Sequence, residues 1–259
     1  MYPFIFPNTI FKIKAWDLSL LVGFIVVLVL SIVNKPKDFP ITRVGIGICT
    51  FLIFCFGMLG ARIISMFLRS ERSNFYLQMG FSYGKIIALS SNAFLGALLF
   101  EILTVLGFVK LRLKRISFLV CADYAIPFMM LHQVFVRVGC FLNGCCYGRP
   151  TKLPWGMVFS YMDSKNLTRH PTQLYYLIFV LFNFFIMRHI YKKGVPAGTV
   201  FFASLALYGI LRCTVEFLRV DSVPILGPVT LAQAAMLLVA FTGFLGLVFV
   251  KFSERRGME

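Results

Sequence analysis

A series of apolar runs, each near the length of a bilayer-spanning helix, constrains this chain more than any other feature. A helix rises about 1.5 Å per residue, so about 20 apolar residues cross the hydrocarbon layer of a membrane. Runs of this length on the surface of a soluble domain would expose large apolar patches to water. The pattern therefore predicts an all-α polytopic membrane protein with about seven transmembrane helices, at 17–34, 44–68, 85–109, 117–138, 173–190, 197–218 and 228–250.

Composition and charge support this class and exclude others. The 259 residues are 59% hydrophobic and 14% charged, whereas a soluble domain has about 25% charged residues. The net charge of +16 would suggest nucleic acid in a soluble protein. However, no zinc-finger spacing or basic aromatic-rich helix is present, and basic loops orient membrane helices and meet anionic lipids. We expect membrane lipids as partners and no nucleic acid. No pair of broken-helix repeats suggests a transporter.

The basic loops also predict an orientation. The strongest signal is "KLRLKR" at 110–115, in a short loop that we expect in the cytoplasm. The N-terminus then lies outside, the C-terminus lies in the cytoplasm, and no cleavable signal is expected in the first residues. The one long connection, 139–172, is rich in Gly, Pro and polar residues. It predicts a small extracytoplasmic head inserted between helices 4 and 5 of a single membrane domain, 1–259.

Charged residues inside the apolar runs mark a candidate site. In "YGILRCTVEFLRVD", residues Tyr208, Arg212, Glu216 and Arg219 share one helix face. A charge near the centre of a membrane helix costs about 2.5–3.5 kcal/mol on insertion scales, so it seldom faces lipid. Arg212 and Glu216 form either a pair that staples helices or part of an anion site. Arg137 either extends to the membrane interface or converges with Arg212 on a phosphate.

Three of the seven cysteines, Cys140, Cys145 and Cys146, cluster at the start of the predicted head. A zinc site needs four ligands, but "CFLNGCC" lacks a second pair and His170 is the one histidine in the segment. We therefore predict no metal ligand. A disulfide, packed thiols and a nucleophilic thiol all remain open. The nearby glycines allow sharp turns, and Asn143 both donates and accepts hydrogen bonds.

Three sequence blocks resemble one enzyme family. "RVGCFLNGCCYGRPT", which starts at Arg137, resembles the signature of the bacterial prolipoprotein diacylglyceryl transferases, which begins with arginine and runs through Asn-Gly to an aromatic-Gly-Arg. "RHPTQLYY" at 169–176 is similar to the family's second block, and "YGILRCTVEFLRVD" to its third. "LLVGF" and "MLGAR" fit its first two helices. The family's architecture of seven spans with the N-terminus outside also resembles the predicted one.

The resemblance implies a function. The family transfers the diacylglyceryl group of phosphatidylglycerol to the lipobox cysteine thiol of a preprolipoprotein and releases glycerol phosphate. It implies these two substrates as partners, no cofactor, and a place in the bacterial cytoplasmic (inner) membrane. The catalytic residues implied are Arg137, Arg212, Glu216 and Asn143. The substrate-binding residues are the same two arginines with Gly144, Gly148, Arg149 and His170.

The chain also departs from the family's pattern. Leu95 stands where members carry a histidine or tyrosine in the third helix, which removes an obvious general base for the acceptor thiol. Cys140 and Cys145 replace an asparagine and a glutamate of the signature, and Trp16 replaces a tyrosine. Two alternatives to the transferase therefore stay open. One is a paralogue with the same phospholipid site and a different acceptor, and the other is an inactive lipid-binding membrane protein.

Overall fold

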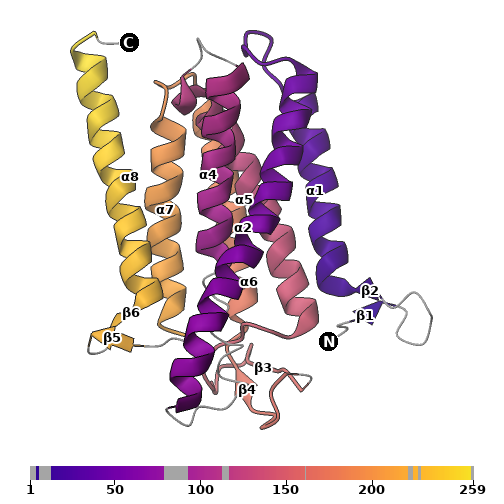
Figure 1. The fold of residues 1–259 in the computed structure, drawn as a ribbon. Coiled ribbons are helices and arrows are strands. Elements are labelled where there is room, and N and C mark those ends of the chain that lie inside the picture. The colour runs from indigo at the N-terminus through magenta and orange to yellow at the C-terminus, as the bar shows by residue number, and fades with distance from the viewer. Residues whose placement is uncertain are drawn as a thin grey trace. The chain divides into compact units, whose positions relative to one another are not determined.

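In the residues that it describes, the computed structural model consists of helices, their connections and three short hairpins (Figure 1). It describes residues 4–5, 13–78, 93–112, 117–160, 162–220, 224–226 and 229–257. The helices are α1 (Ala15–Val33), α2 (Arg43–Gln78), α4 (Ala93–Arg112), α5 (Phe118–Asn143), α6 (Thr172–Lys192), α7 (Thr199–Glu216) and α8 (Leu231–Arg255). Antiparallel strands form the pairs β1 (Phe4–Ile5) with β2 (Ile13–Lys14), β3 (Met157–Val158) with β4 (Thr168–Arg169), and β5 (Pro224–Leu226) with β6 (Val229–Thr230).

The prediction of a polytopic membrane protein is confirmed. Among the described residues, six helices are long and apolar enough to cross a membrane: α1, α2, α5, α6, α7 and α8. Large apolar side chains stay exposed along α8, where water would oppose them and lipid would not: Leu237, Leu238, Phe241, Phe244, Leu245, Val248, Phe249 and Phe252. Residues 85–92 of the predicted third span lie outside the described residues, and α4 covers the rest of it.

Most helix ends follow from local chemistry. After α1, Pro36 cannot continue a helix, because it has no backbone N–H to donate. Thr230 and Gln233 form a reciprocal capping box at the start of α8. Helix α5 accommodates Pro127 in its interior and continues to Asn143. Thus the first five residues of the predicted head at 139–172 are helical, and the irregular head begins after α5 ends.

Chain contacts divide the protein into two units, Met1–Leu30 with Ala122–Glu259, and Ser31–Cys121. In the first unit, α7 packs between α6 and α8 (Figure 1). The buried Asn183 of α6 and Ser204 of α7 exchange hydrogen bonds of 3.3 and 3.1 Å, which join the two helices where lipid offers no partner. Gly209 lets α7 approach α8, because a Cβ there would lie 2.6 Å from the carbonyl oxygen of Met236.

Asp123, a charged residue of an apolar run, caps a helix. Its two carboxylate oxygens accept hydrogen bonds of 2.7 Å from the backbone N–H groups of Gly198 and Phe201 at the start of α7. A helix leaves its first N–H groups without partners, and its dipole favours an anion there. The charge of Asp123 is therefore explained by the fold, and it anchors α7, which carries Arg212 and Glu216.

In the second unit, α2 packs against α4. Gly60 allows this contact, since a Cβ there would lie 2.5 Å from the carbonyl oxygen of Gly96. A Cβ at Gly57 would lie 2.7 Å from the Glu101 carboxylate, so a glycine makes room for that acid. In the first unit, the β3–β4 and β5–β6 hairpins lie at one end of the helices and the C-terminal end of α8 lies at the other (Figure 1).

Candidate functional site

Tyr176 lies at the centre of a buried polar cluster. It comes from α6, and its side chain is only 2% exposed. The guanidinium carbons of Arg137 on α5 and Arg212 on α7 lie 4.7 and 4.6 Å from the centroid of its ring. At this separation the ring's quadrupole attracts a cation. The predicted convergence of the two arginines from separate helices is therefore present, and the ring of Tyr176 joins them.

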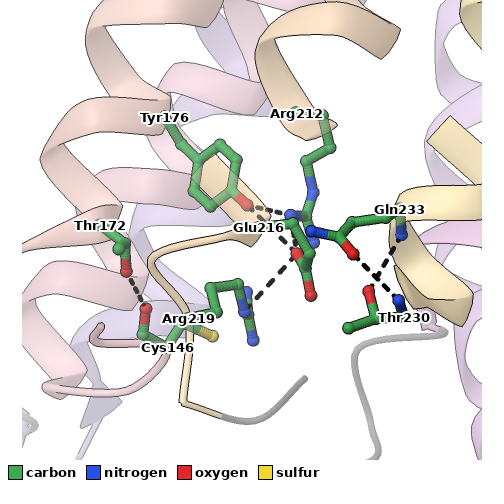
Figure 2. A network of polar contacts seen from close by, with 8 residues as sticks. All are labelled: Cys146, Thr172, Tyr176, Arg212, Glu216, Arg219, Thr230 and Gln233. Carbon is green, nitrogen blue, oxygen red and sulfur yellow. Dashed lines mark hydrogen bonds and ion pairs between the residues drawn. The ribbon is translucent and has the colours of Figure 1, made fainter. Parts of the chain in front are cut away.

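Glu216 pairs with the same cluster. One of its carboxylate oxygens accepts a hydrogen bond from Arg212, which also donates to the Tyr176 hydroxyl (Figure 2). The same carboxylate oxygen lies 3.5 Å from the Tyr176 hydroxyl and 3.9 Å from the Nε of Arg219. The ion pair predicted between Arg212 and Glu216 thus exists, but it belongs to a larger cluster rather than forming an isolated staple.

Positive charge exceeds negative charge in this cluster. Arg137, Arg212 and Arg219 each carry a positive charge, and both Arg137 and Arg219 act electrostatically on Arg212. Among the residues that the structure describes, Glu216 is the acidic side chain paired with these arginines. The Nε of Arg137 is buried and has no hydrogen-bond partner among the described residues. Because a buried unpaired donor is costly, this arrangement suits an anionic ligand with oxygen acceptors.

The signature segment after α5 is tied to the chain on both sides of the cluster. The backbone N–H of Gly148 donates to the carbonyl of His170 over 2.8 Å, and Gly148 forms a bridge with Arg219. A Cβ at Gly148 would lie 2.6 Å from the carbonyl oxygen of Leu218, so only glycine fits. Gly144 has a φ of 73° and turns the chain directly after Asn143 ends α5. These glycines shape the segment that faces the arginines.

Arg149 and His170 lie beside this segment rather than in the cluster. Arg149 is exposed and donates from Nε to the carbonyl of Arg219 over 3.3 Å. His170 is half-buried, and its Nδ1 lies 3.1 Å from the hydroxyl of Tyr175. That hydroxyl also accepts a hydrogen bond of 2.8 Å from Trp155. Both predicted residues thus lie near Gly148, and their described hydrogen bonds go to Arg219 and Tyr175 rather than to Tyr176.

A second ion pair holds the irregular segment between α5 and α6. Asp163 and Arg169 are both buried, and they form hydrogen bonds of 2.6 and 3.1 Å. The Arg169 guanidinium holds the pKa of the Asp163 carboxyl below its ordinary value, and backbone N–H groups of Lys165 and Leu167 add to this. Arg169 also lies 4.9 Å from the ring centroid of Tyr147. This pair stabilises the segment and leaves the cluster's charge balance unchanged.

Sequence reasoning missed two residues of the site. Tyr176 lies within "RHPTQLYY", but a tyrosine in an apolar run gave no separate signal of its role. Gln173 of the same block is 0% exposed, and its Nε2 donates to the carbonyl of Cys145 over 2.6 Å. Its Oε1 is buried without a hydrogen-bond partner among the described residues. A polar amide side chain at the start of an apolar run was the one signal in the sequence that Gln173 has a role.

The departures from the family's pattern fall in different places. Trp16 lies on α1 against α5, because a Cβ at Gly139 would be 3.1 Å from the indole. Cys140 and Cys145 lie at the end of α5 and just after it. Leu95 is a residue of α4 in the second unit, and its side chain lies outside the described part of the chain.

Comparison of the sequence with known proteins identifies a family. The family model described as "prolipoprotein diacylglyceryl transferase" matches residues 3–249. A phosphatidylglycerol–prolipoprotein diacylglyceryl transferase of Clostridium tetani is 39% identical over 127 residues, which cover 48% of this chain and 50% of that protein. The enzyme of the same name from Geobacter sulfurreducens is 36% identical over 171 residues, 63% of this chain and 62% of its own. These matches therefore span less than two thirds of the relatives' length.

Proposed function

The chain belongs to the prolipoprotein diacylglyceryl transferase family, and on this premise we propose that it transfers the diacylglyceryl group of phosphatidylglycerol to a lipobox cysteine thiol. The proposal takes its donor and acceptor from the names of the relatives. The observation that carries it is the buried cluster in an apolar bundle, in which Arg137 and Arg212 lie against the ring of Tyr176 and Arg219 lies beside Glu216. A phospholipid headgroup is the anion that a membrane supplies to such a site.

In the proposed reaction, Arg137 and Arg212 hold the phosphodiester, and the acceptor sulfur attacks the adjacent glyceryl carbon. The carbon–oxygen bond breaks, its electron pair leaves on the phosphate oxygen, and glycerol phosphate is released. The thiol's proton is lost before or during attack. Because charge builds up on the departing phosphate in a site shielded from water, fixed guanidinium groups stabilise the transition state more than the ground state.

The remaining predicted residues have supporting roles in the proposal. Glu216 orients Arg212, and Asn143, Gly144 and Gly148 shape the segment beside the headgroup. Arg149 and His170 form its outer rim. The protein is proposed to be a single domain, 1–259, in the bacterial cytoplasmic membrane, with the N-terminus and the 139–172 head outside. This proposal is supported by the position of the β3–β4 hairpin, which lies at the opposite end of the helices from the C-terminal end of α8 (Figure 1).

The test is a transfer assay with purified full-length protein in vesicles that contain phosphatidylglycerol. A lipobox peptide is the acceptor, and the same peptide with serine in place of cysteine is its control. We expect the cysteine peptide to gain the mass of a diacylglyceryl group. Arg137→Ala and Arg212→Ala are each expected to lower the rate on the order of 100-fold, the usual effect of losing one group that stabilises transition-state charge.

Two results would replace this proposal with an alternative. Transfer to other thiols or alcohols but not to the lipobox peptide would indicate a paralogue with a different acceptor. Retention of phosphatidylglycerol that depends on Arg137 and Arg212, without transfer to any acceptor, would indicate an inactive lipid-binding protein. Complementation of a bacterium depleted of its own transferase checks the same conclusion in cells.

A further inference from the structure

Three cysteine sulfur atoms meet at the end of α5. The Sγ atoms of Cys140, Cys145 and Cys146 all lie within 4.8 Å of one another. Cys140 belongs to the last turn of α5, and the other two follow the left-handed turn at Gly144. The sequence offered no fourth ligand and so predicted no metal. The structure nevertheless brings together a set of three donors, which is enough for a cation site with one position left open.

The spacing of the sulfur atoms suits a thiophilic cation. A zinc–sulfur bond is about 2.3 Å, so three thiolates around one tetrahedral ion lie about 3.8 Å apart. Since no pair exceeds 4.8 Å, the sulfur atoms need to close by at most about 1 Å. Thiolates are soft ligands and select Zn²⁺ or Cu⁺ over Mg²⁺ or Ca²⁺.

The backbone that carries two of these cysteines is held by α6. The hydroxyl of Thr172 donates to the carbonyl of Cys146 over 2.5 Å (Figure 2), and Gln173 donates to the carbonyl of Cys145 over 2.6 Å. Both side chains are 0% exposed. Cys146 itself has a φ of 63°, a left-handed conformation that is costly for a residue with a Cβ. Such outer contacts orient ligands before a cation arrives.

The surrounding charges also suit this donor set. Three thiolates around a divalent cation carry a net charge of −1, which needs a positive neighbour in an apolar setting. Arg219 and Arg137 both act electrostatically on Cys146. The same two arginines belong to the cluster around Tyr176 and Glu216. A cation at the three sulfurs would therefore lie beside the proposed headgroup site.

We propose that Cys140, Cys145 and Cys146 bind one thiophilic cation of the Zn²⁺ class, and that its fourth coordination position binds the acceptor thiol. The second half rests on the proposed transferase function. A thiol that coordinates such an ion loses its proton to solvent and stays bound as a thiolate. This sulfur attacks the glyceryl carbon, the carbon–oxygen bond breaks, and the electron pair leaves with the phosphate. The cation thereby does for the acceptor thiol what a general base would do.

Metal binding is tested first, without any assay of activity. Reduced full-length protein in lipid nanodiscs is titrated with Co²⁺, whose thiolate complexes absorb strongly in the near ultraviolet. We expect one Co²⁺ per chain and displacement of the band by Zn²⁺. Cys140→Ser, Cys145→Ser and Cys146→Ser should each lose the band, whereas Cys55→Ser, on the exposed side of α2, should keep it. No band in reduced wild type, or an unchanged band in all three variants, overturns the proposal.

A second measurement needs no variant and so does not depend on variant folding. Zn²⁺ bound to wild-type protein should slow alkylation of the three clustered thiols by at least about 10-fold, as mapped by mass spectrometry, and leave Cys55 unchanged. That factor corresponds to about 1.4 kcal/mol of protection. Equal alkylation with and without Zn²⁺ contradicts the site.

The acceptor half has its own measurement. A lipobox peptide should shift the Co²⁺ spectrum of the protein, whereas its serine analogue should not. No shift from the cysteine peptide overturns the open fourth position. Transfer by protein stripped of metal would remove the cation's role yet uphold the transferase. Absence of transfer by protein that binds Co²⁺ and the peptide thiol would instead count against the transferase, so the two failures are distinct.

Discussion

Arg137 and Arg212 come from α5 and α7 and lie against the same aromatic ring, with guanidinium carbons 4.7 and 4.6 Å from the centroid of Tyr176. Two like charges this close repel, so the arrangement needs something that stabilises both. The ring of Tyr176 supplies part of this stabilisation, and the negative charge of Glu216 pairs with Arg212. A bound anion would supply the remaining stabilisation. The two arginines therefore form a site that favours binding of an anionic ligand.

Replacement of Tyr176 tests the ring directly. Tyr176→Phe keeps the ring that both guanidinium groups contact and loses the hydroxyl that accepts from Arg212. Tyr176→Leu loses both, and a desolvated cation–π contact is worth up to about 2 kcal/mol. We expect the Leu variant to have a lower melting temperature and weaker phosphatidylglycerol binding than the Phe variant. Identical behaviour of the two variants would show that the ring contributes nothing.

Glu216→Gln should increase the thermal stabilisation that the protein gains from an anionic lipid. Removal of the carboxylate breaks the ion pairs that Glu216 forms with Arg212 and Arg219. A buried charge that loses its partner costs about 3–5 kcal/mol. The variant is therefore expected to melt at a lower temperature in neutral lipid. The increase in melting temperature on adding phosphatidylglycerol should exceed that of the wild type, and a smaller increase would contradict the charge balance described for the cluster.

Gly148→Ala should disrupt the signature segment. Its Cβ would lie 2.6 Å from the carbonyl oxygen of Leu218 and 2.8 Å from the Cβ of His170, so backbone must move. Destabilisation at such a crowded site is at the upper end of single-residue effects, about 3 kcal/mol. Gly107→Ala on α4 is the matched control, because nothing lies within 4 Å of its Cβ. We expect thermal melting to detect a loss in the first variant and little change or a gain in the second.

The Asp163–Arg169 pair predicts a pH dependence of stability. Because the pKa of Asp163 is lowered in the folded protein, its contribution is present above the ordinary value of 3.8 and lost as pH falls through the lowered one. The melting temperature of the wild-type protein should fall as the pH is lowered below 3.8. Asp163→Asn should melt at a lower temperature near neutral pH, and its melting temperature should fall less steeply with acid. If its melting temperature falls as steeply as that of the wild type, the loss of stability in acid comes from other groups.

The transmembrane helices were largely predictable because the bilayer imposes a length and an apolar composition on each span, independently of its neighbours. Helix ends were less predictable. Helix α5 continues through Gly139 and Cys140 to Asn143, where the sequence predicted the head to have begun. Glycine lowers helix propensity, but packing of α5 against Trp16 and Ser19 of α1 favours it at Gly139.

The candidate site divides in the same way. Arg212 and Glu216 could be predicted because charges in an apolar run are expensive, and a helix brings residues four apart together. Asp123 shared this signal, yet its contacts with Gly198 and Phe201 make it a helix cap. A charge in a span therefore indicates that a partner exists, but it does not indicate which kind.

By itself the sequence determined the class of protein, the placement of most spans and the arginines of the candidate site, because each depends on the local cost of placing a residue in lipid. Only the tertiary structure decided that Arg137 and Arg212 lie against the ring of Tyr176, and that three cysteine sulfurs meet. Those relationships depend on contacts between α5, α6 and α7, where residues far apart in the chain become neighbours through packing that no local pattern encodes.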